Sequence, residues 1–388
     1  MQVPDWIWFV FIFAFGCCVG SFLNVVIYRL PRDKSLVKPG SACPACGRHI
    51  RFYDNIPLIS WLVLAAKCRY CKSPISPRYF TIELLTSLVF TGLFYLYFCT
   101  DFREGIPPFL AGGEIVYFLH IIMLAAFIAA SAIDMELWII PLAICWFVTV
   151  VGLIGSSVGA FIINPVLISS YNLLPNASTV TGALAAGAVV GLGISLFAMA
   201  TGLIKRSYES DDSDSEVSEP VKEHDKVAEP HFNHRLEAFK EVVFLLPMIV
   251  CALGAFLLSK IIPSVHTWWM EFSQIPVITG VLGSMWGYFM GCGIVWATRI
   301  LGTLGFGKEA MGLGDVHLMG AAGAVIGSGL VAVAFFIAPF YGLAWAVFQM
   351  FFKKIRQIPY GPFLSLGIFT VMIFHDWIFR YLNIIFYR

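Results

Sequence analysis

The chain has 388 residues, of which 59% are hydrophobic and 13% are charged, and its mean hydropathy is +0.82. Soluble domains carry about one quarter charged residues, so this composition excludes an ordinary water-soluble protein. The formal net charge of +1 gives no basis for a nucleic-acid partner. Apolar runs long enough to cross a lipid bilayer recur along the sequence, and they are continuous rather than alternating. We therefore expect an all-α polytopic membrane protein with about ten transmembrane helices.

The first apolar run, residues 6–28, has no basic residue before it. A cleaved signal peptide begins with a positive segment, so we expect residues 1–29 to form a retained transmembrane helix. Residues 30–81 then form the first sizeable polar segment. Between Tyr28 and Ile82 the chain has ten Lys or Arg residues and only two acidic ones. By the positive-inside rule, this excess places the polar segment on the cytoplasmic side.

Four cysteines in this polar segment form two C-x-x-C pairs separated by 21 residues. They are Cys43 and Cys46, then Cys68 and Cys71. This spacing is typical of a zinc site with four thiolate ligands, in which each pair reaches the ion from one turn. Four protein ligands leave no open coordination position, so the predicted zinc ribbon has a structural metal ion. A pair of redox-active dithiols is the alternative interpretation.

Further apolar runs follow at residues 82–99, 115–133, 139–163 and 180–203, and after a polar segment at 242–262, 275–300, 316–328, 329–352 and 362–386. With the first run they give ten crossings and place both termini outside. Residues 82–204 and 242–388 are thus two sets of transmembrane helices. Residues 205–241 between them hold an acidic stretch that cannot bury enough apolar area to fold, so we expect a disordered cytoplasmic loop.

Two acids, Asp134 and Asp315, stand at the expected cytoplasmic ends of apolar runs, where an ionisable residue is a functional candidate. Two carboxyl groups close together share a proton, and such a pair can act as general base and general acid on one water. The alternative is that each aspartate caps a helix, and the spacing alone leaves both interpretations open. Gly312 and Gly314 would allow a close backbone approach beside Asp315.

Two further polar residues near these acids are candidates for a supporting role. Glu136 follows Asp134 by two positions, and His317 follows Asp315 by two positions. Glu136 is expected to orient its neighbours or to be solvated, and His317 to tune the acid pair.

The chain resembles the type IV prepilin peptidases, which are leader peptidases and N-methyltransferases of pilus and type II secretion systems. The resemblance rests on six segments in the family's order. They are GSFLNVVIYRLPR, CPACGRHIRFYDNIPLISWL, KCRYCKSPISPRYFTIELLT, IDMELWIIP, GKEAMGLGDVHLMGAAGAVIG and IPYGPFLSLG. The region between about residues 165 and 276 lies outside these motifs, so the chain looks like an enlarged member with extra helices.

The resemblance implies that Asp134 and Asp315 are the paired catalytic aspartates, and that the four cysteines bind a structural zinc ion. It implies that prepilins or pseudopilins are the substrates, and that the new N-terminus receives a methyl group from S-adenosylmethionine. The residues that bind this methyl donor are not identified. The implied location is the bacterial inner membrane, with the ribbon and the active site at the cytoplasmic face. Pilus or secretion assembly components are possible partners.

Two alternatives to this function remain open from the residues alone. One is a peptidase without methylase activity. The other is a zinc-ribbon membrane scaffold or transporter, in which the acids are structural or carry protons.

Overall fold

A computed structural model describes residues 5–204, 207, 233–352 and 359–386. In these ranges the regular structure is helical, and only two isolated β-bridges occur, both in the ribbon. The all-α expectation is therefore confirmed. The helices before residue 205 are α1 (Asp5–Arg29), α2 (Ile59–Val63), α3 (Pro77–Phe98), α4 (Gly113–Leu137), α5 (Leu142–Ile162), α6 (Pro165–Tyr171) and α7 (Thr179–Ala200). Those after it are α8 (His234–Ile261), α9 (Pro263–Ser273), α10 (Pro276–Phe306), α11 (Leu313–Ile326), α12 (Ser328–Phe352), α13 (Gly361–Ile373) and α14 (His375–Phe386).

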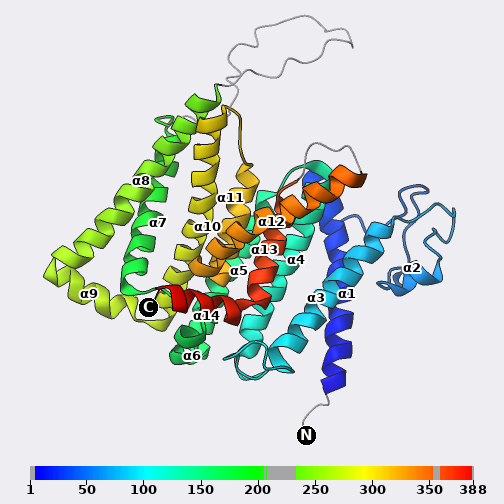
Figure 1. Cartoon of the computed structure of the whole chain (residues 1–388). Coiled ribbons are helices and arrows are strands. Elements are labelled where there is room, and N and C mark those ends of the chain that lie inside the picture. Colours follow the sequence, from blue (N-terminus) through cyan, green and yellow to red (C-terminus); the bar gives the residue numbers. More distant parts are fainter. Residues whose placement is uncertain (1–4, 205–206, 208–232, 353–358, 387–388) are drawn as a thin grey trace, which may run out of the picture.

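The helices pack side by side into a bundle, which Figure 1 shows from the side. Helices α1 and α3 form one edge, with the polar ribbon and its short helix α2 beside them. Helices α4, α5, α10, α11 and α13 form the centre. Helices α7, α8 and α9 form the opposite edge, where α7 and α8 pair closely and contact α10.

The number of possible membrane crossings differs from the expected ten. Within the described ranges eight helices are long and apolar enough to cross a bilayer, and a ninth crossing results if α13 and α14 count as one bent span. The expected crossing at 362–386 is broken, because α13 and α14 meet at an angle of 79°. The expected crossing at 316–328 is the short apolar helix α11 of 14 residues.

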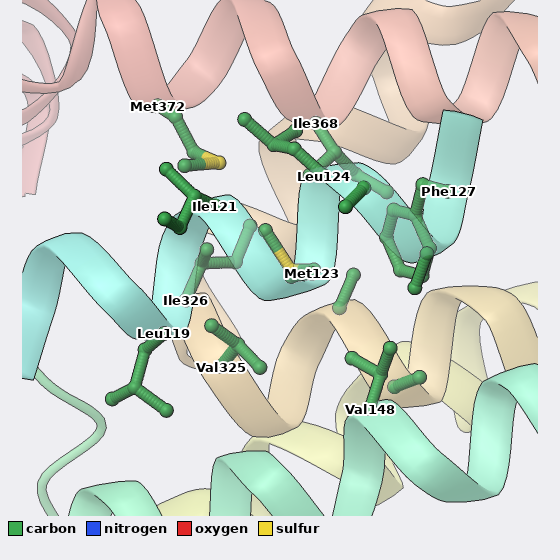
Figure 2. Close-up of a cluster of buried hydrophobic side chains, with 14 of the residues drawn as sticks. Leu119, Ile121, Met123, Leu124, Phe127, Val148, Val325, Ile326, Ile368 and Met372 are labelled. Carbon is green, nitrogen blue, oxygen red and sulfur yellow. The ribbon is translucent and has the colours of Figure 1, made fainter. Parts of the chain in front are cut away.

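Helix α11 can be short because other helices surround it, so it does not have to span lipid by itself. Figure 2 shows the apolar side chains that enclose it, from α4, α5 and α13. Helix α10 approaches it most closely. A Cβ atom on Gly323 of α11 would lie 2.0 Å from the carbonyl oxygen of Gly287 on α10, so glycine is required for this backbone contact. The result is a buried helix that carries Asp315 at its first turn.

Helix α8 begins at His234, inside the range 205–241 that we expected to be a loop. The boundary between loop and helix therefore lies earlier than the sequence indicated. Residues 205–206 and 208–232, which contain nearly all of the acidic stretch, lie outside the described residues. The expectation of a disordered acidic loop stays a prediction for them.

A buried ion pair explains the break between α13 and α14. Arg103, which follows α3 and is 5% exposed, donates to Oδ1 of Asp376 at 2.7 Å. The backbone N–H of Glu104 donates to Oδ2 of the same carboxylate at 2.7 Å. His375 Nδ1 lies 2.8 Å from Oδ1, so the carboxylate is engaged from three directions. The first turn of α14 is thereby fixed against the loop between α3 and α4.

We expect the variant Asp376→Asn to destabilise the protein, because it leaves the Arg103 charge buried beside a neutral amide. Breaking one side of a buried pair costs about 3–5 kcal/mol. The measurement is the melting temperature of the purified protein in detergent. The matched control is Glu104→Gln, which breaks the exposed pair of Glu104 with Arg380 and should cost about 0–1 kcal/mol. Equal melting temperatures for the two variants would contradict the assigned role of Asp376.

Candidate active site

Asp134 lies in the last turn of α4, three residues before the helix ends at Leu137. It is 7% exposed. A carboxylate at this end of a helix is electrostatically disfavoured, because the unsatisfied carbonyl groups there carry partial negative charge. Asp134 is therefore not the N-terminal cap that the alternative interpretation of the sequence required.

The N-terminus of α13 compensates for this unfavourable position. The backbone N–H of Gly361, the first residue of α13, donates to Oδ2 of Asp134 at 3.0 Å. The carboxylate thus lies at the positive end of a second helix. A Cβ atom on residue 361 would lie only 2.7 Å from the same oxygen, so glycine permits the contact.

Asp315 lies in the first turn of α11 and is 8% exposed. The backbone N–H of Gly312, the residue that caps the helix, lies near this carboxylate. Asp315 thus has the position of the acid in a capping box, three residues after the cap residue. The interpretation of Asp315 as a helix-terminus residue is therefore correct as a local description.

The two acids nevertheless lie near each other, so capping does not describe the whole site. The carboxylates of Asp134 and Asp315 are close enough to interact electrostatically. The segment after α4 brings them together, because it packs on the first turn of α11. A Cβ atom on Gly314 would lie 2.8 Å from Cβ of Ile140, so this glycine allows the contact between the two segments.

The two supporting residues predicted from the sequence have other partners. Glu136 forms an ion pair with Arg78 at the start of α3, which fixes the end of α4 beside the ribbon. His317 Nδ1 lies 3.0 Å from the hydroxyl of Tyr288 on α10, and its ring lies near that of Trp146. Residues two apart on a helix point to different faces, so His317 faces α10 and α5 and lies on a different side of α11 from Asp315.

Sequence reasoning assigned no role to three residues that contact the acids or the segment before them. Gly361 donates to Asp134, and Tyr360 lies close enough to Asp315 to be affected by its charge. Both belong to the IPYGPFLSLG segment, whose Y-G-P sequence was the available signal. The third residue, Arg299 on α10, donates to the backbone carbonyl of Met311, just before Gly312. No sequence pattern marked Arg299.

Burial and the nearby charge of Asp315 raise the pKa of Tyr360 to about 12. The Tyr360 hydroxyl therefore stays protonated near neutral pH and remains a hydrogen-bond donor beside the acid pair.

Exposed apolar side chains are close to both acids in the sequence. Met135, Trp138 and Ile139 follow Asp134, and Leu313 precedes Asp315; all four are exposed. Exposed apolar residues at these positions can contact an apolar chain.

The four ribbon cysteines come together as their spacing predicted. Their sulfur atoms all lie within 4.8 Å of one another, and the sulfurs of Cys43 and Cys71 are 3.8 Å apart. Two zinc–sulfur bonds of about 2.3 Å at a tetrahedral angle require a separation of about 3.8 Å. The cluster therefore fits one zinc ion with four thiolate ligands.

The two halves of the ribbon repeat the same local structure. In the first, the N–H of Gly47 donates to the carbonyl of Cys43 at 2.8 Å, and in the second the N–H of Lys72 donates to the carbonyl of Cys68 at 3.1 Å. Both donor residues have positive φ, 68° and 59°. Backbone N–H groups of Cys46 and Ala45 lower the pKa of the Cys43 thiol, whereas the pKa of the neighbouring Cys46 thiol is raised by burial and by Cys43.

One polar contact inside the ribbon and one to the bundle fix its position. Inside the ribbon, Arg69 forms a bidentate bond with the carboxylate of Asp54, with Nη2 to Oδ1 at 2.6 Å. Glu83 of α3 accepts the N–H of Leu58 at 2.7 Å, which attaches the ribbon to the bundle. Together with the Arg78–Glu136 pair, this second contact places the ribbon at the same end of the bundle as Asp134.

Comparisons with known proteins agree with this arrangement. The family model described as "Bacterial Peptidase A24 N-terminal domain" matches residues 14–97, which contain α1, the ribbon and most of α3. No solved structure matches the chain.

Several relatives are similar over part of their length. The prepilin leader peptidase/N-methyltransferase of Myxococcus xanthus is 41% identical over 152 residues, which make up 39% of this chain and 40% of the relative. The protein of the same name from Klebsiella pneumoniae is 38% identical over 146 residues, 36% of this chain and 58% of the relative. A type 4 prepilin-like proteins leader peptide-processing enzyme of Escherichia coli is 39% identical over 140 residues, 31% of this chain and 46% of the relative.

The matched part of this chain thus spans about half the length of these relatives. Over this part of its length the chain is therefore similar to the prepilin leader peptidase/N-methyltransferases.

Proposed function

We propose that this protein is a membrane aspartic endopeptidase that removes the leader peptide of prepilins or pseudopilins. The observation that carries the proposal is the acid pair. Two buried carboxylates from helices far apart in the chain lie within electrostatic range, and Asp134 accepts the backbone N–H of Gly361. A pair with a structural role only would be neutralised by a cation between the two groups, whereas two like charges in proximity share a proton.

The shared proton gives the pair both functions that peptide hydrolysis requires. The ionised carboxylate takes a proton from a water molecule, whose oxygen attacks the scissile carbonyl carbon. The protonated carboxyl donates its proton to the carbonyl oxygen. When the tetrahedral intermediate breaks down, a proton passes to the leaving amine and the carbon–nitrogen bond breaks. The N–H group of Gly361 holds the Asp134 carboxyl in position throughout.

The surroundings of the pair suit a prepilin substrate, in which a short basic leader is joined to an apolar helix. The exposed apolar residues beside the acids, such as Trp138 and Leu313, offer a surface for that helix. The excess of basic residues in the ribbon supports a cytoplasmic position for the site. The inner membrane is then the membrane that the bundle spans.

A second step, methylation of the new N-terminus, is proposed from the names of the relatives. S-adenosylmethionine would supply the methyl group. The residues that bind it remain to be assigned.

The variants Asp134→Asn and Asp315→Asn should each reduce leader cleavage by about 10²-fold or more, because an amide neither takes nor gives the proton. The measurement is the mass of the products from a prepilin incubated with the purified protein in lipid vesicles. Glu136→Gln is the matched control, since Glu136 pairs with Arg78 and should not act on the substrate. Full cleavage by either aspartate variant would refute the proposed function.

The variant Gly361→Ala should reduce cleavage by about 10-fold or more, because its Cβ would displace the Asp134 carboxylate. The initial rate of leader release reports the effect. Gly342→Ala is the control, since a Cβ there meets only ordinary contacts at 3.7 Å and beyond. Equal rates for the two variants would show that the contact between α13 and Asp134 does not position the acid.

The protein should bind about one zinc ion per chain, and Cys43→Ser should lower this content strongly, because a structural zinc site needs all four ligands. Metal analysis of the purified protein measures it. Cys18→Ser, on the exposed face of α1, is the control and should retain the metal ion. If the wild-type protein forms disulfides among the four cysteines and binds no zinc, the redox interpretation holds instead.

A further inference from the structure

Arg299 of α10 is a buried cation that contacts the segment leading into Asp315. It is 4% exposed. Its Nη1 group donates to Oε1 of Glu309 at 2.7 Å and to the backbone carbonyl of Met311. Both acceptors lie in the short connection between α10, which ends at Phe306, and α11.

The other side of the guanidinium contacts a different part of the fold. Nε donates to Oε1 of Glu241 at 3.0 Å, and Nη2 lies 3.0 Å from the same oxygen. Glu241 is 5% exposed and belongs to α8. The indole N–H of Trp296, also on α10, donates to Oε2 of Glu241 at 2.9 Å, so this carboxylate is fixed by two residues of one helix.

These contacts join α8 to the connection before α11 through one planar group. Arginine is suited to this, because its fork of donors can serve two acceptors in fixed directions. Helix α8 lies in the region outside the family motifs, at the edge of the bundle formed by α7, α8 and α9. The connection between α10 and α11, which leads into Asp315, is therefore held by a helix that lies outside the six segments that resemble the family.

Arg299 contacts the chain just before Asp315, so these contacts can affect the position of this acid. Met311 directly precedes Gly312, whose backbone N–H lies near the Asp315 carboxylate. A shift of the Met311 carbonyl would move this N–H and the start of α11 together. The Arg299 charge is also near enough to act on the Asp315 carboxylate.

We propose that Arg299 is a positioning residue for Asp315 and that Glu241 of α8 holds Arg299 in place, so that the extra helices complete the active site. This inference rests on the proposed peptidase function. It assigns α8 a role in cleavage at a distance from the substrate.

The competing explanation is that the Arg299–Glu241 pair has a purely structural role. Replacing both residues by hydrophobic ones distinguishes this explanation from a positioning role. Replacing both members of a buried ion pair by apolar residues of similar volume often preserves stability. The double variant Glu241→Leu/Arg299→Met should therefore keep the melting temperature and zinc content. It should still lose cleavage, because no group then holds the Met311 carbonyl.

The expected result for this double variant is a fall in kcat of about 10²-fold with little change in KM, as for a catalytic group displaced by about 1 Å. Arg299→Lys provides a second test that keeps the charge. Its ammonium cannot serve Glu241 and the connection before α11 at once, so kcat should also fall while KM stays nearly constant. The matched control is Arg380→Gln, which breaks an exposed ion pair with Glu104 and should cleave normally.

Normal cleavage by either a folded Glu241→Leu/Arg299→Met protein or Arg299→Lys would overturn the inference. A rise in KM with kcat unchanged would also overturn it, since Arg299 would then contribute to substrate binding. These outcomes are distinguishable from failure of the proposed function, because Asp315→Asn is measured in the same assay. If Asp315→Asn is inactive and the double variant is active, only the role of Arg299 is lost.

Discussion

The hydrogen bond between the N–H of Gly361 and the carboxylate of Asp134 is the contact on which the candidate active site depends. Asp134 is near the negative end of α4, where a carboxylate is disfavoured, and α13 supplies the opposite field at the same point. The acid can therefore stay buried without a cation beside it. An acid neutralised by a cation would be a poor partner for a proton-sharing pair, whereas one held by a backbone N–H can still exchange a proton.

The second acid depends on how α11 is enclosed. Its 14 residues would not cross a bilayer alone, but α4, α5, α10 and α13 cover it, and glycines let the backbones of α10 and α11 approach closely. Tight backbone packing leaves α11 little freedom to shift. Asp315 at its first turn is consequently fixed relative to α4, and the segment around Ile140 completes the contact. Exposed apolar residues, such as Trp138 and Leu313, are close to this rigidly supported pair in the sequence.

Much of this arrangement was predictable from the sequence. Composition and continuous apolar runs predict the helical bundle, and the cysteine spacing predicts the cluster that the fold forms. The locations of Asp134 and Asp315 at the ends of apolar runs indicated the two acids. Their opposite helix ends were not predictable, because helix boundaries near a turn such as residues 138–141 depend on tertiary packing.

Other features could not be predicted because they depend on pairs distant in sequence. The break after Ile373 results from Arg103, which lies 273 residues before Asp376. The role of Arg299 depends on Glu241, 58 residues earlier in a region without family motifs. The hydropathy pattern predicts α13 and α14 as one span, because the apolar composition is continuous across both helices. The buried ion pair at their junction, which bends the chain, has no effect on this pattern. No local sequence pattern marks Arg103 or Glu241 as a partner in these pairs.

The central claim is that Asp134 and Asp315 act as one unit, and the double variant Asp134→Asn/Asp315→Asn tests it most directly. Groups that act together show strongly non-additive losses, because removing one already disables the other. The measurement is kcat/KM for leader cleavage by the double variant and by each single variant, with residual rates followed by product mass. The account predicts that the double variant is about as slow as the slower single variant. A loss equal to the product of the two single losses would show two independent acids and contradict the account.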